Sequence, residues 1–317
     1  MKFATLGTGG IGGFLGLKLS QGGFKVATIA RGRHLGVIKD RGLSLISNGH
    51  EHTVKPWMAT DNAESVGPVD VIFLGVKGDN LKDAAEKCKP MLQDHTIVIP
   101  FLNGVEASSI ISNILNPRNV GNGVAYISAT ISSPGTITQT GPNQKFLIAE
   151  TDNKLTQRMT TLLQISNKCD VSSPPTKDIQ IDLWSKFIFF SALSGITAAA
   201  RCNIGDILDN PELSKLFKDV IAEAAELARA SNISVDIQVE ANTWNFIQNL
   251  PREMRASTAI DLEKGNPLEI NWTIGAVSRM SEALGITAPI SGAIYSLLTP
   301  FKNGCSTETN SEDLLHG

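Results

Sequence analysis

The feature that most constrains the fold is a glycine-rich segment near the start of the chain. Residues 7–12 read Gly-Thr-Gly-Gly-Ile-Gly and fit the pattern G-x-G-x-x-G. They follow a short apolar run at residues 2–6 and open a stretch with helical periodicity at residues 11–21. A glycine loop between a first strand and a helix is typical of the dinucleotide-binding βαβ unit, so we expect a Rossmann-type domain here.

Each glycine of this loop has a physical task in such a fold. The first allows a tight turn, the second lets the backbone approach a pyrophosphate, and the third lets the helix pack close to the strand. The free N–H groups at the start of the helix, together with its dipole, attract phosphate. We therefore predict that a dinucleotide binds at Gly7, Thr8, Gly9, Gly10, Ile11 and Gly12. The alternative is a structural glycine turn that binds no ligand.

The residue after the second predicted strand, residues 25–30, distinguishes between the two nicotinamide dinucleotides. NAD sites usually carry Asp or Glu there, which accepts a hydrogen bond from the ribose 2′-hydroxyl. This chain has Arg31 instead, and an arginine suits the 2′-phosphate of NADP(H). We therefore expect NADP(H) as the cofactor, the alternative being that Arg31 is a solvated loop residue.

Two further residues follow strands at the positions where this fold places ligands. Lys77 follows the almost wholly apolar run at residues 69–76, and Asn103 follows the strand-like run at residues 96–101. Lys77 could reach a phosphate or ribose of the cofactor, and Asn103 could face both the nicotinamide ribose and the substrate. For Asn103 the alternative is a simple Asn-Gly turn.

The periodicity of the chain changes about half-way along. The first part alternates strand-like and helical runs, which predicts an α/β fold with a doubly wound parallel sheet. The segment Ser-Ser-Pro-Pro-Thr at residues 172–176 marks a boundary, because paired prolines cannot continue a helix. Helical periodicity prevails beyond it. We expect a Rossmann-type domain at residues 1–172, a mainly α-helical domain at residues 177–303 and a disordered polar tail at residues 304–317.

Composition limits the classes of function. The 317 residues carry a formal net charge of −3 with no basic tract, which argues against a nucleic-acid partner. No apolar run approaches the roughly 18 residues of a membrane span, and the start reads as a strand and not as a signal peptide. Four scattered cysteines predict the reduced thiols of a cytoplasmic protein. Gly-His-Glu-His at residues 49–52 predicts a solvated hairpin in preference to a metal site.

Further motifs occur in both halves of the chain. Beside the glycine loop and Arg31, the first half has Val-Lys at residues 76–77 and Asn-Gly at residues 103–104. The second half has Leu-Trp-Ser-Lys at residues 183–186 and Thr-Ala at residues 197–198, followed by Ser257, Asp261 and Leu-Glu-Ile-Asn at residues 268–271. In this order, from about residue 1 to residue 298, they resemble the motifs of the ketopantoate reductase (2-dehydropantoate 2-reductase) family.

The resemblance implies an activity and a set of site residues. The family reduces the ketone of 2-dehydropantoate to pantoate with NADPH, on the route to coenzyme A. By resemblance, Lys186 is the general acid and Glu269 is a carboxylate that orients the substrate. Ser257 then contacts the substrate carboxylate, and Asn103 lies near the reacting ketone. A lysine suits this chemistry, because hydride transfer builds negative charge on the ketone oxygen and burial readily lowers a lysine pKa.

Each of these residues also has a purely structural alternative. Asp182, four residues before Lys186, could pair with that lysine on one face of a helix. Glu269 could only stabilise the dipole of a following helix. Ser257 could be only a helix cap.

Two positions depart from the family pattern. Family members usually carry asparagines one and two turns after the lysine, where this chain has Phe190 and Ser194. We expect both residues to contact the substrate. The loss of two amides removes polar contacts, and Phe190 makes the wall more apolar, so the preferred substrate can be a more apolar 2-oxoacid.

Other readings stay open at this point. The chain could be an NADPH-binding regulator without catalysis, or a relative of 3-hydroxyisobutyrate or 6-phosphogluconate dehydrogenases, which also place a lysine on a helix of the second domain. The helical domain could form a homodimer through an apolar face made of Leu213, Leu216, Phe217 and Val220. The alternative is that these four side chains form the core of that domain.

Overall fold

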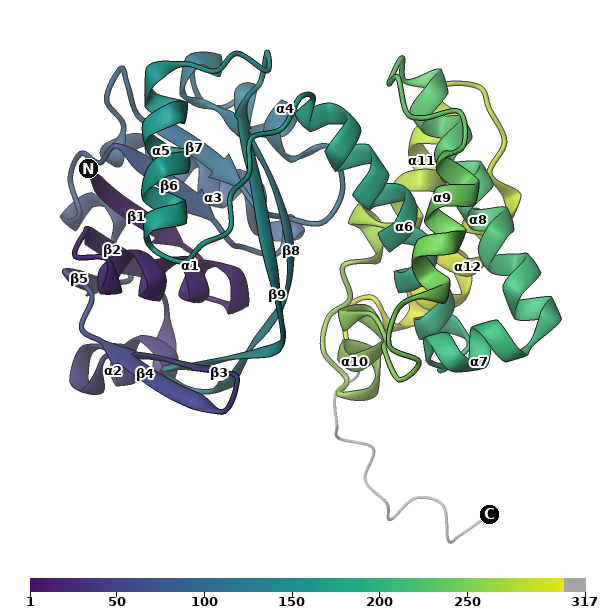
Figure 1. Ribbon diagram of the computed structural model, residues 1–317, viewed down its shortest axis with the longest axis horizontal. Helices are drawn as coiled ribbons and strands as arrows, with labels where there is room; N and C mark the ends of the chain where they lie inside the picture. Colours follow the sequence, from purple (N-terminus) through teal and green to yellow (C-terminus); the bar gives the residue numbers. More distant parts are fainter. Residues whose placement is uncertain (305–317) are drawn as a thin grey trace, which may run out of the picture. The chain divides into compact units, whose positions relative to one another are not determined.

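The computed structural model describes residues 1–304, apart from the side chains of Pro142 and Asn143 (Figure 1). From residue 305 on, the predicted disordered tail lies outside the described residues. The chain divides into two compact units, Met1–Leu183 and Trp184–Gly317, called here the N-terminal and C-terminal units. The predicted boundary segment, residues 172–176, is irregular, and the carbonyl of Ser172 accepts a hydrogen bond from the N–H of Phe146 within the N-terminal unit.

The N-terminal unit is built on a five-stranded sheet in the order β5-β2-β1-β6-β7. All four strand pairs are parallel, which confirms the predicted Rossmann-type sheet. The chain starts in the middle, runs outward to one side and then crosses to the other. The ligand crevice of such a sheet lies where this order reverses, beside the C-terminal end of the first strand. The strands are β1 (Lys2–Leu6), β2 (Lys25–Ile29), β5 (Met58–Thr60), β6 (Val71–Leu74) and β7 (Ile97–Pro100).

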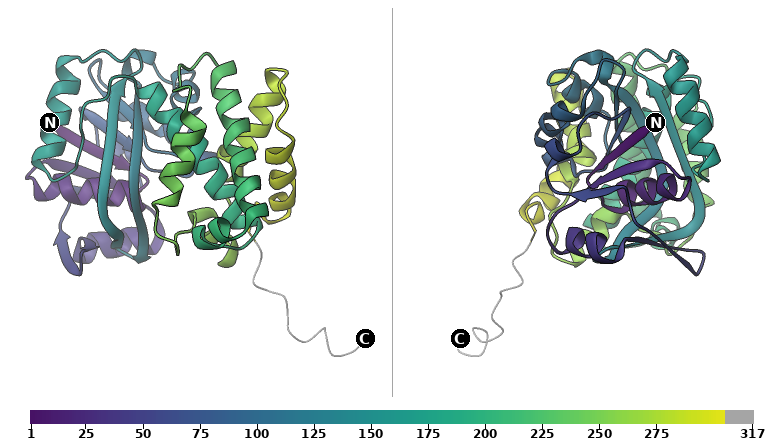
Figure 2. Two further views of the ribbon diagram at one scale, coloured as in Figure 1. Left: turned by 45° about the vertical axis from the view of Figure 1, so that its right-hand side comes forward. Right: turned by 90° about the vertical axis from the view of Figure 1, so that its left-hand side faces the viewer.

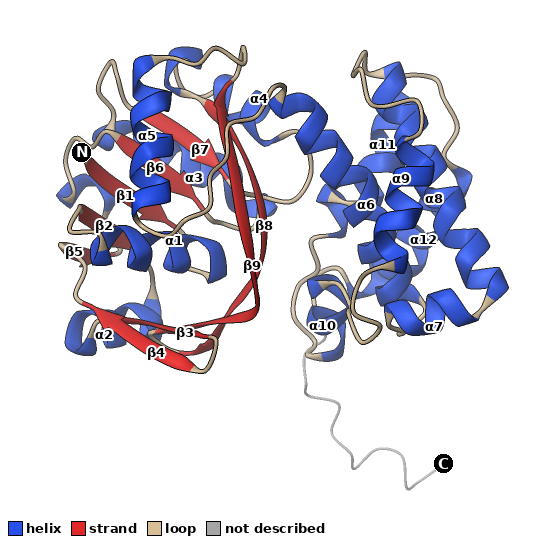
Figure 3. Cartoon of the chain, viewed as in Figure 1, coloured by secondary structure: helices blue, strands red, loops and turns tan. Residues whose placement is uncertain are grey.

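A second sheet of four strands completes this unit, in the order β4-β3-β9-β8 (Figure 3). Its long antiparallel hairpin consists of β8 (Gly121–Ser133) and β9 (Thr136–Glu150). The predicted hairpin around His50 is confirmed, since β3 (Leu43–Ser47) and β4 (His50–Val54) pair antiparallel with exposed histidines. Within residues 1–304, no group of three or more His, Cys, Asp or Glu side chains is arranged to hold a metal ion.

Phenylalanine side chains join the two sheets into one core. Phe14 of α1 (Gly10–Gln21) stacks on Phe146 of β9 with ring centroids 5.7 Å apart, and Phe101 meets Phe146 edge-on at 5.4 Å. Phe101 in turn contacts Phe73 of β6 at 5.7 Å. Helix α1 contacts β1 and β2 of the first sheet and β3, β8 and β9 of the second. The position of the loop therefore depends on both sheets.

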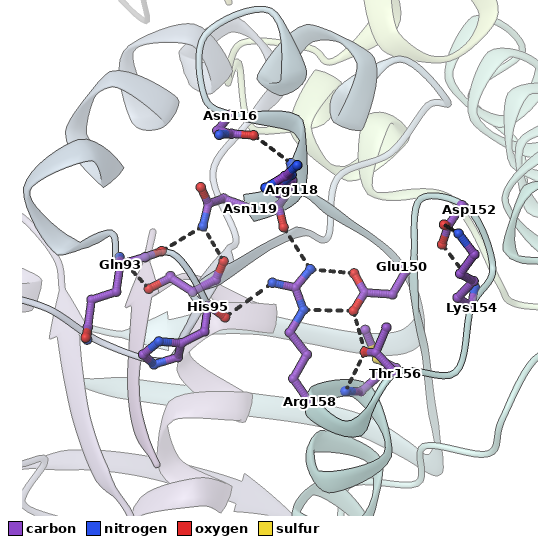
Figure 4. Close-up of polar contacts among 12 residues, drawn as sticks. Gln93, His95, Asn116, Arg118, Asn119, Glu150, Asp152, Lys154, Thr156 and Arg158 are labelled. Atoms are coloured by element: carbon purple, nitrogen blue, oxygen red, sulfur yellow. Dashed lines mark hydrogen bonds and ion pairs between the residues drawn. The ribbon is translucent and has the colours of Figure 1, made fainter.

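A partly buried ion pair fixes the end of the β8–β9 hairpin (Figure 4). Arg158 of α5 (Gln157–Lys168) donates from Nε to Glu150 Oε1 at 2.8 Å and from a terminal nitrogen to Oε2 at 2.6 Å. Glu150 is only 6% exposed, and Thr156 Oγ1 donates a further bond to it at 2.6 Å. The same guanidinium donates to the backbone carbonyls of His95 and Arg118, so one residue ties α5 to two loops.

The C-terminal unit is mainly α-helical, as predicted (Figures 1 and 2). Its longest helix, α6, begins at Ile179, within the N-terminal unit, and continues into the C-terminal unit. This helix is apolar on most of its surface, and a helix of that kind must be buried. Helix α8 begins at Pro211 after Asn210, whose side chain accepts from the N–H groups of Glu212 and Leu213. The helices are α6 (Ile179–Ala199), α7 (Ile204–Asp209), α8 (Pro211–Ala230), α9 (Val239–Gln248), α10 (Ser257–Glu263), α11 (Ile274–Ala283) and α12 (Pro289–Leu298).

The apolar face considered for a homodimer contains two side chains that are fully buried. Phe217 and Val220 are fully buried within the C-terminal unit, whereas Leu213 and Leu216 are partly exposed. Phe217 and Val220 therefore belong to the core of the C-terminal unit, as the structural alternative proposed. They are not available to a partner subunit. None of the helices in residues 1–304 combines the length and apolar character that crossing a bilayer requires.

Candidate active site

The glycine loop connects β1 to α1, and two of its glycines are required by the packing of the protein itself. Gly7 has φ of +89°, and a Cβ atom there would lie 2.7 Å from the backbone of Gly75. A Cβ atom at Gly12 would lie 2.2 Å from the carbonyl oxygen of Gly7. Any larger residue at either position would collide with backbone, so these glycines fix the tight turn and the close approach of helix to strand.

Gly9 differs from its neighbours, because the space beside it is almost open within residues 1–304. A Cβ atom at Gly9 would meet only the carbonyl oxygen of Gly75, at an ordinary 3.8 Å. Gly9 is also the N-cap of α1, and no side chain caps the helix there. The loop thus presents open backbone and the N–H groups of a helix start at the same point, an arrangement that suits a diphosphate.

The β8–β9 hairpin supports this loop from the side. A Cβ atom at Gly10 would lie 1.9 Å from the carbonyl oxygen of Ala129 in β8. At Gly13 it would lie 2.6 Å from the side chain of Ile137 in β9. These contacts explain why the glycines continue beyond the three that the dinucleotide pattern needs.

The other predicted cofactor residues follow parallel strands of the same sheet. Arg31 is exposed and is the N-cap of α2 (Gly32–Arg41), directly after β2. Lys77 is exposed and follows β6, and Asn103 is half-buried and follows β7. Gly104 has φ of +93°, so the turn after Asn103 requires a glycine. Since the carboxyl ends of parallel strands share one edge, these three side chains and the glycine loop lie along the same edge of the sheet.

His34 is a residue of this site that sequence analysis did not assign. Its Nδ1 accepts a hydrogen bond from the N–H of Gly135 at 2.9 Å, so Nε2 carries the proton and donates to the carbonyl of Thr8 at 2.8 Å. Burial lowers the pKa of His34, and the bond to Thr8 acts in the opposite direction. The neutral ring therefore links the glycine loop to the turn between β8 and β9.

In the C-terminal unit, the predicted catalytic residue Lys186 lies on α6. Burial lowers the pKa of its ammonium group from 10.5 to about 8, and the negative charge of Glu269 acts in the opposite direction. The Nζ atom lies 5.8 Å from the ring centroid of Phe190, one turn further along the helix. Such a lysine can give up a proton near neutral pH, as a general acid must.

The structure gives Asp182 and Glu269 different surroundings from those that the structural alternatives assumed. The carboxylate of Asp182 accepts a hydrogen bond from Thr176 Oγ1, and the charge that acts on the Lys186 pKa is that of Glu269. Glu269 is partly exposed and precedes a single turn, η5 (Ile270–Trp272). Helix α11 begins only at Ile274, so Glu269 does not lie in its first turn, where a helix dipole is felt.

Ser257 and Ser194 have different environments. Ser257 is exposed and is the first residue of α10, but Ala256 is the N-cap and no side chain caps the helix, so the capping alternative is wrong. Ser194 is fully buried, with Oγ 2.8 Å from Thr258 Oγ1 and 3.3 Å from Thr273 Oγ1. The structure thus places Ser194 among internal hydroxyl groups, in contrast to the substrate contact expected for it.

Comparison with known proteins identifies the family. Residues 3–153 match the family model described as ketopantoate reductase PanE/ApbA, and residues 178–302 match the model of its C-terminal domain. The chain belongs to the ketopantoate reductase family. This membership makes it an oxidoreductase and confirms the resemblance found in the sequence motifs.

Relatives and solved structures cover almost the whole chain. The 2-dehydropantoate 2-reductase of Mesorhizobium japonicum is 27% identical over 94% of this chain and 97% of its own. The crystal structure of the PanE/ApbA family ketopantoate reductase of Ralstonia eutropha JMP134 has a TM-score of 0.87 and 26% identity, covering 95% of this chain and 98% of its own. D-Mandelate dehydrogenase, solved with NADH and anilino(oxo)acetate, shows the same fold with a TM-score of 0.86, 22% identity, and coverage of 95% and 98%.

Proposed function

We propose that this protein is an NADPH-dependent reductase of 2-oxoacids, with 2-dehydropantoate as the first candidate substrate and pantoate as the product. The observation that carries the proposal is the lysine on α6. Lys186 combines a pKa of about 8 with the nearby charge of Glu269, and the motif resemblance to the family implies a general acid at this position. The presence of both residues argues against a regulator without catalysis, because a site that performs no reaction has no need of this pair.

The residues of the N-terminal unit fit NADPH. The open backbone at Gly9 and the uncapped start of α1 would hold the diphosphate. Arg31 would pair with the 2′-phosphate, and residues 29–34 contain no carboxylate to repel it. Lys77 would contact a phosphate or ribose, and Asn103 the nicotinamide ribose. When bound, NADPH supplies the hydride.

The residues of the C-terminal unit supply the proton and hold the substrate. Negative charge develops on the ketone oxygen as hydride arrives, and the ammonium of Lys186 would stabilise it and then donate a proton to it. Glu269 keeps the pKa of Lys186 from falling further and so maintains the protonated form at neutral pH. Ser257 would donate a hydrogen bond to the substrate carboxylate, and Asn103 would lie near the ketone.

A more apolar 2-oxoacid is the second candidate substrate. Phe190 brings an aromatic ring close to Lys186, and the hydroxyl of Ser194 is already bonded to two threonines. Neither position offers the amide that family members usually present. The substituent on the ketone carbon of the substrate would therefore meet fewer polar groups. This difference motivates tests with 2-oxoacids that carry alkyl or phenyl groups.

The proposal is tested by following NADPH oxidation with purified protein and a panel of 2-oxoacids. The panel contains 2-dehydropantoate, 2-oxoisovalerate, pyruvate and benzoylformate, with NADH in parallel. Turnover of 2-dehydropantoate with a preference for NADPH supports the first candidate. Turnover of the apolar acids alone supports the second, and no turnover with any 2-oxoacid contradicts the proposed function.

A further inference from the structure

The exposed Ser257 lies between two buried residues that are both bonded to α6. The N–H of Ala256 donates to Thr197 Oγ1 at 3.3 Å, and Thr258 Oγ1 is hydrogen-bonded to Ser194 Oγ at 2.8 Å. Ala256 and Thr258 are 2% and 3% exposed, and Ser194 and Thr197 are fully buried. Both neighbours of Ser257 are thus attached to the same helix, on either side of the one residue that faces outward.

Ser194 and Thr197 lie on the face of α6 that carries the predicted catalytic lysine. Residues 186, 190, 194 and 197 follow one another at intervals of three or four along the helix, so they line one face. Ser194 is two turns, about 12 Å, along the helix from Lys186. Helix α6 therefore determines the position of the start of α10 relative to Lys186.

The segment that carries Glu269 is attached to the same point. Thr273 Oγ1 is 3.3 Å from Ser194 Oγ and donates a long bond of 3.5 Å to the carbonyl of Glu269. Gly195 allows the close approach, because a Cβ atom there would lie 3.1 Å from the side chain of Ile274. One buried group of hydroxyls, those of Ser194, Thr258 and Thr273, thus joins the three segments that carry Lys186, Ser257 and Glu269.

Thr197 adds a bond that orients the backbone of α10. Its hydroxyl donates to the carbonyl of Leu193 at 2.7 Å, as threonine often does within a helix, and its oxygen accepts from Ala256. Ala256 is the N-cap of α10, so this contact fixes the residue from which the helix starts. A buried hydroxyl that both donates and accepts a hydrogen bond holds its two partners in one geometry.

We infer that Ser194 and Thr197 are positioning residues that hold Ser257 in place to bind the substrate carboxylate. The inference rests on the proposed function for the nature of the ligand. It also explains why a serine can replace the asparagine of the family at position 194, since a short hydroxyl side chain reaches Thr258 and Thr273 inside the core. Ser194 then acts on substrate binding through its neighbours and not by contact.

The test compares Thr197→Val, Ser194→Ala and Thr258→Val with a matched control, Ser191→Ala. Ser191 is fully buried on the same helix, and among residues 1–304 its hydroxyl has no hydrogen-bond partner. We expect KM for the 2-oxoacid to rise roughly tenfold in the three variants, as when one bond to a charged group is weakened, with kcat and KM for NADPH within about threefold of wild type. Thr197→Ser and Thr258→Ser, which keep the hydroxyl, should restore KM.

Amide hydrogen exchange gives a readout that does not depend on turnover. Thr197→Val should speed exchange of the Ala256 amide, because that N–H loses its acceptor, whereas Ser191→Ala should leave it unchanged. If the Ala256 amide exchanges at the same rate in Thr197→Val as in wild type, Thr197 does not hold the start of α10 and the inference is overturned. Faster exchange with an unchanged substrate KM overturns the role in substrate binding. If the wild-type protein reduces no 2-oxoacid, the proposed function and the substrate role fall together, and exchange alone decides the attachment.

Discussion

The ring of His34 accepts a hydrogen bond from the N–H of Gly135, a residue 101 positions further along the chain. Through its other nitrogen the same ring donates to the carbonyl of Thr8, in the glycine loop. Both bonds require the neutral tautomer with its proton on Nε2. A protonated ring would direct Nδ1–H at the N–H of Gly135, so protonation breaks the link between the loop and the β8–β9 turn.

This relationship predicts that His34→Ala weakens cofactor binding. Each lost hydrogen bond is worth about 1 kcal/mol, so we expect Kd for NADPH to rise roughly fivefold or more. Titration of NADPH fluorescence measures it, and His52→Ala, an exposed histidine of β4, is the control. Because the folded-state pKa of His34 lies below 6.5, the unfolded chain binds the proton first, and the free energy of unfolding should fall as the pH drops below that value. If the free energy of unfolding depends on pH in the same way in His34→Ala and in wild type, the neutral His34 ring does not stabilise the fold.

Gly9 and Gly12 should respond differently to the same substitution. Gly9→Ala adds a Cβ atom in open space, so the free energy of unfolding should change by less than about 1 kcal/mol while Kd for NADPH rises roughly tenfold or more. Gly12→Ala places a Cβ atom 2.2 Å from the carbonyl oxygen of Gly7 and should destabilise the fold by about 1–3 kcal/mol. Urea unfolding and NADPH titration separate the two effects. Tight NADPH binding by a folded Gly9→Ala variant would show that no diphosphate approaches there.

Arg31 should determine the choice between the two dinucleotides. Removal of a charge-assisted pair with the 2′-phosphate in Arg31→Ala should raise KM for NADPH roughly 10- to 100-fold and leave KM for NADH almost unchanged. Arg41→Ala, at the other end of α2, is a control on an exposed arginine of the same helix. Equal losses for both cofactors would mean that Arg31 does not bind the 2′-phosphate.

Lys186→Ala should separate binding from chemistry. We expect kcat to fall about 10²- to 10⁴-fold, the usual contribution of a general acid, with Kd for NADPH within about twofold of wild type. Lys264→Ala changes an exposed lysine of the same unit and should retain activity. A Lys186→Ala variant with wild-type kcat would remove this lysine from the mechanism.

The rate of reduction should depend on pH through Lys186. The protonated form is the acid, so kcat should fall as the pH rises through about 8, the pKa of this group. The charge of Glu269 raises that pKa, so Glu269→Gln should move the alkaline limb of the profile to lower pH. If the alkaline limb of the kcat profile lies at the same pH in Glu269→Gln and in wild type, Glu269 does not affect the pKa of the proton donor.

Much of the N-terminal unit could be predicted because its signals are local. The predicted strand at residues 2–6 and the helix after the glycine loop are found within one residue of their expected ends. Helix α2 has no clear signal in the sequence, since Gly32 and Gly36 lower its helix propensity and its N-terminal turn lacks an acidic or capping side chain. The short strand β5, with three residues, is formed by pairing to β2 and has no pattern of its own.

The site shows the same division between local and tertiary information. Lys186 and Glu269 could be proposed as site residues from sequence because their motifs are contiguous. The burial of Ser194 could not, because its partners Thr258 and Thr273 lie 64 and 79 residues away and no local pattern pairs hydroxyls over that distance. His34 was hidden for a similar reason, since its acceptor and donor roles depend on Thr8 and Gly135, which only the folded sheet brings together.

The support that β8 and β9 give to the glycine loop has a consequence for how this protein acquires its cofactor during synthesis. A nascent chain that ends after the first βαβ units contains the whole loop sequence but lacks Ala129, Gly135 and Ile137, which hold the loop in place. Contacts between residues that are so far apart in the sequence form late, because a large loop must close first. Fluorescence of bound NADPH should therefore appear only once the hairpin has docked, so that cofactor binding reports completion of the entire N-terminal unit and not of its first turn.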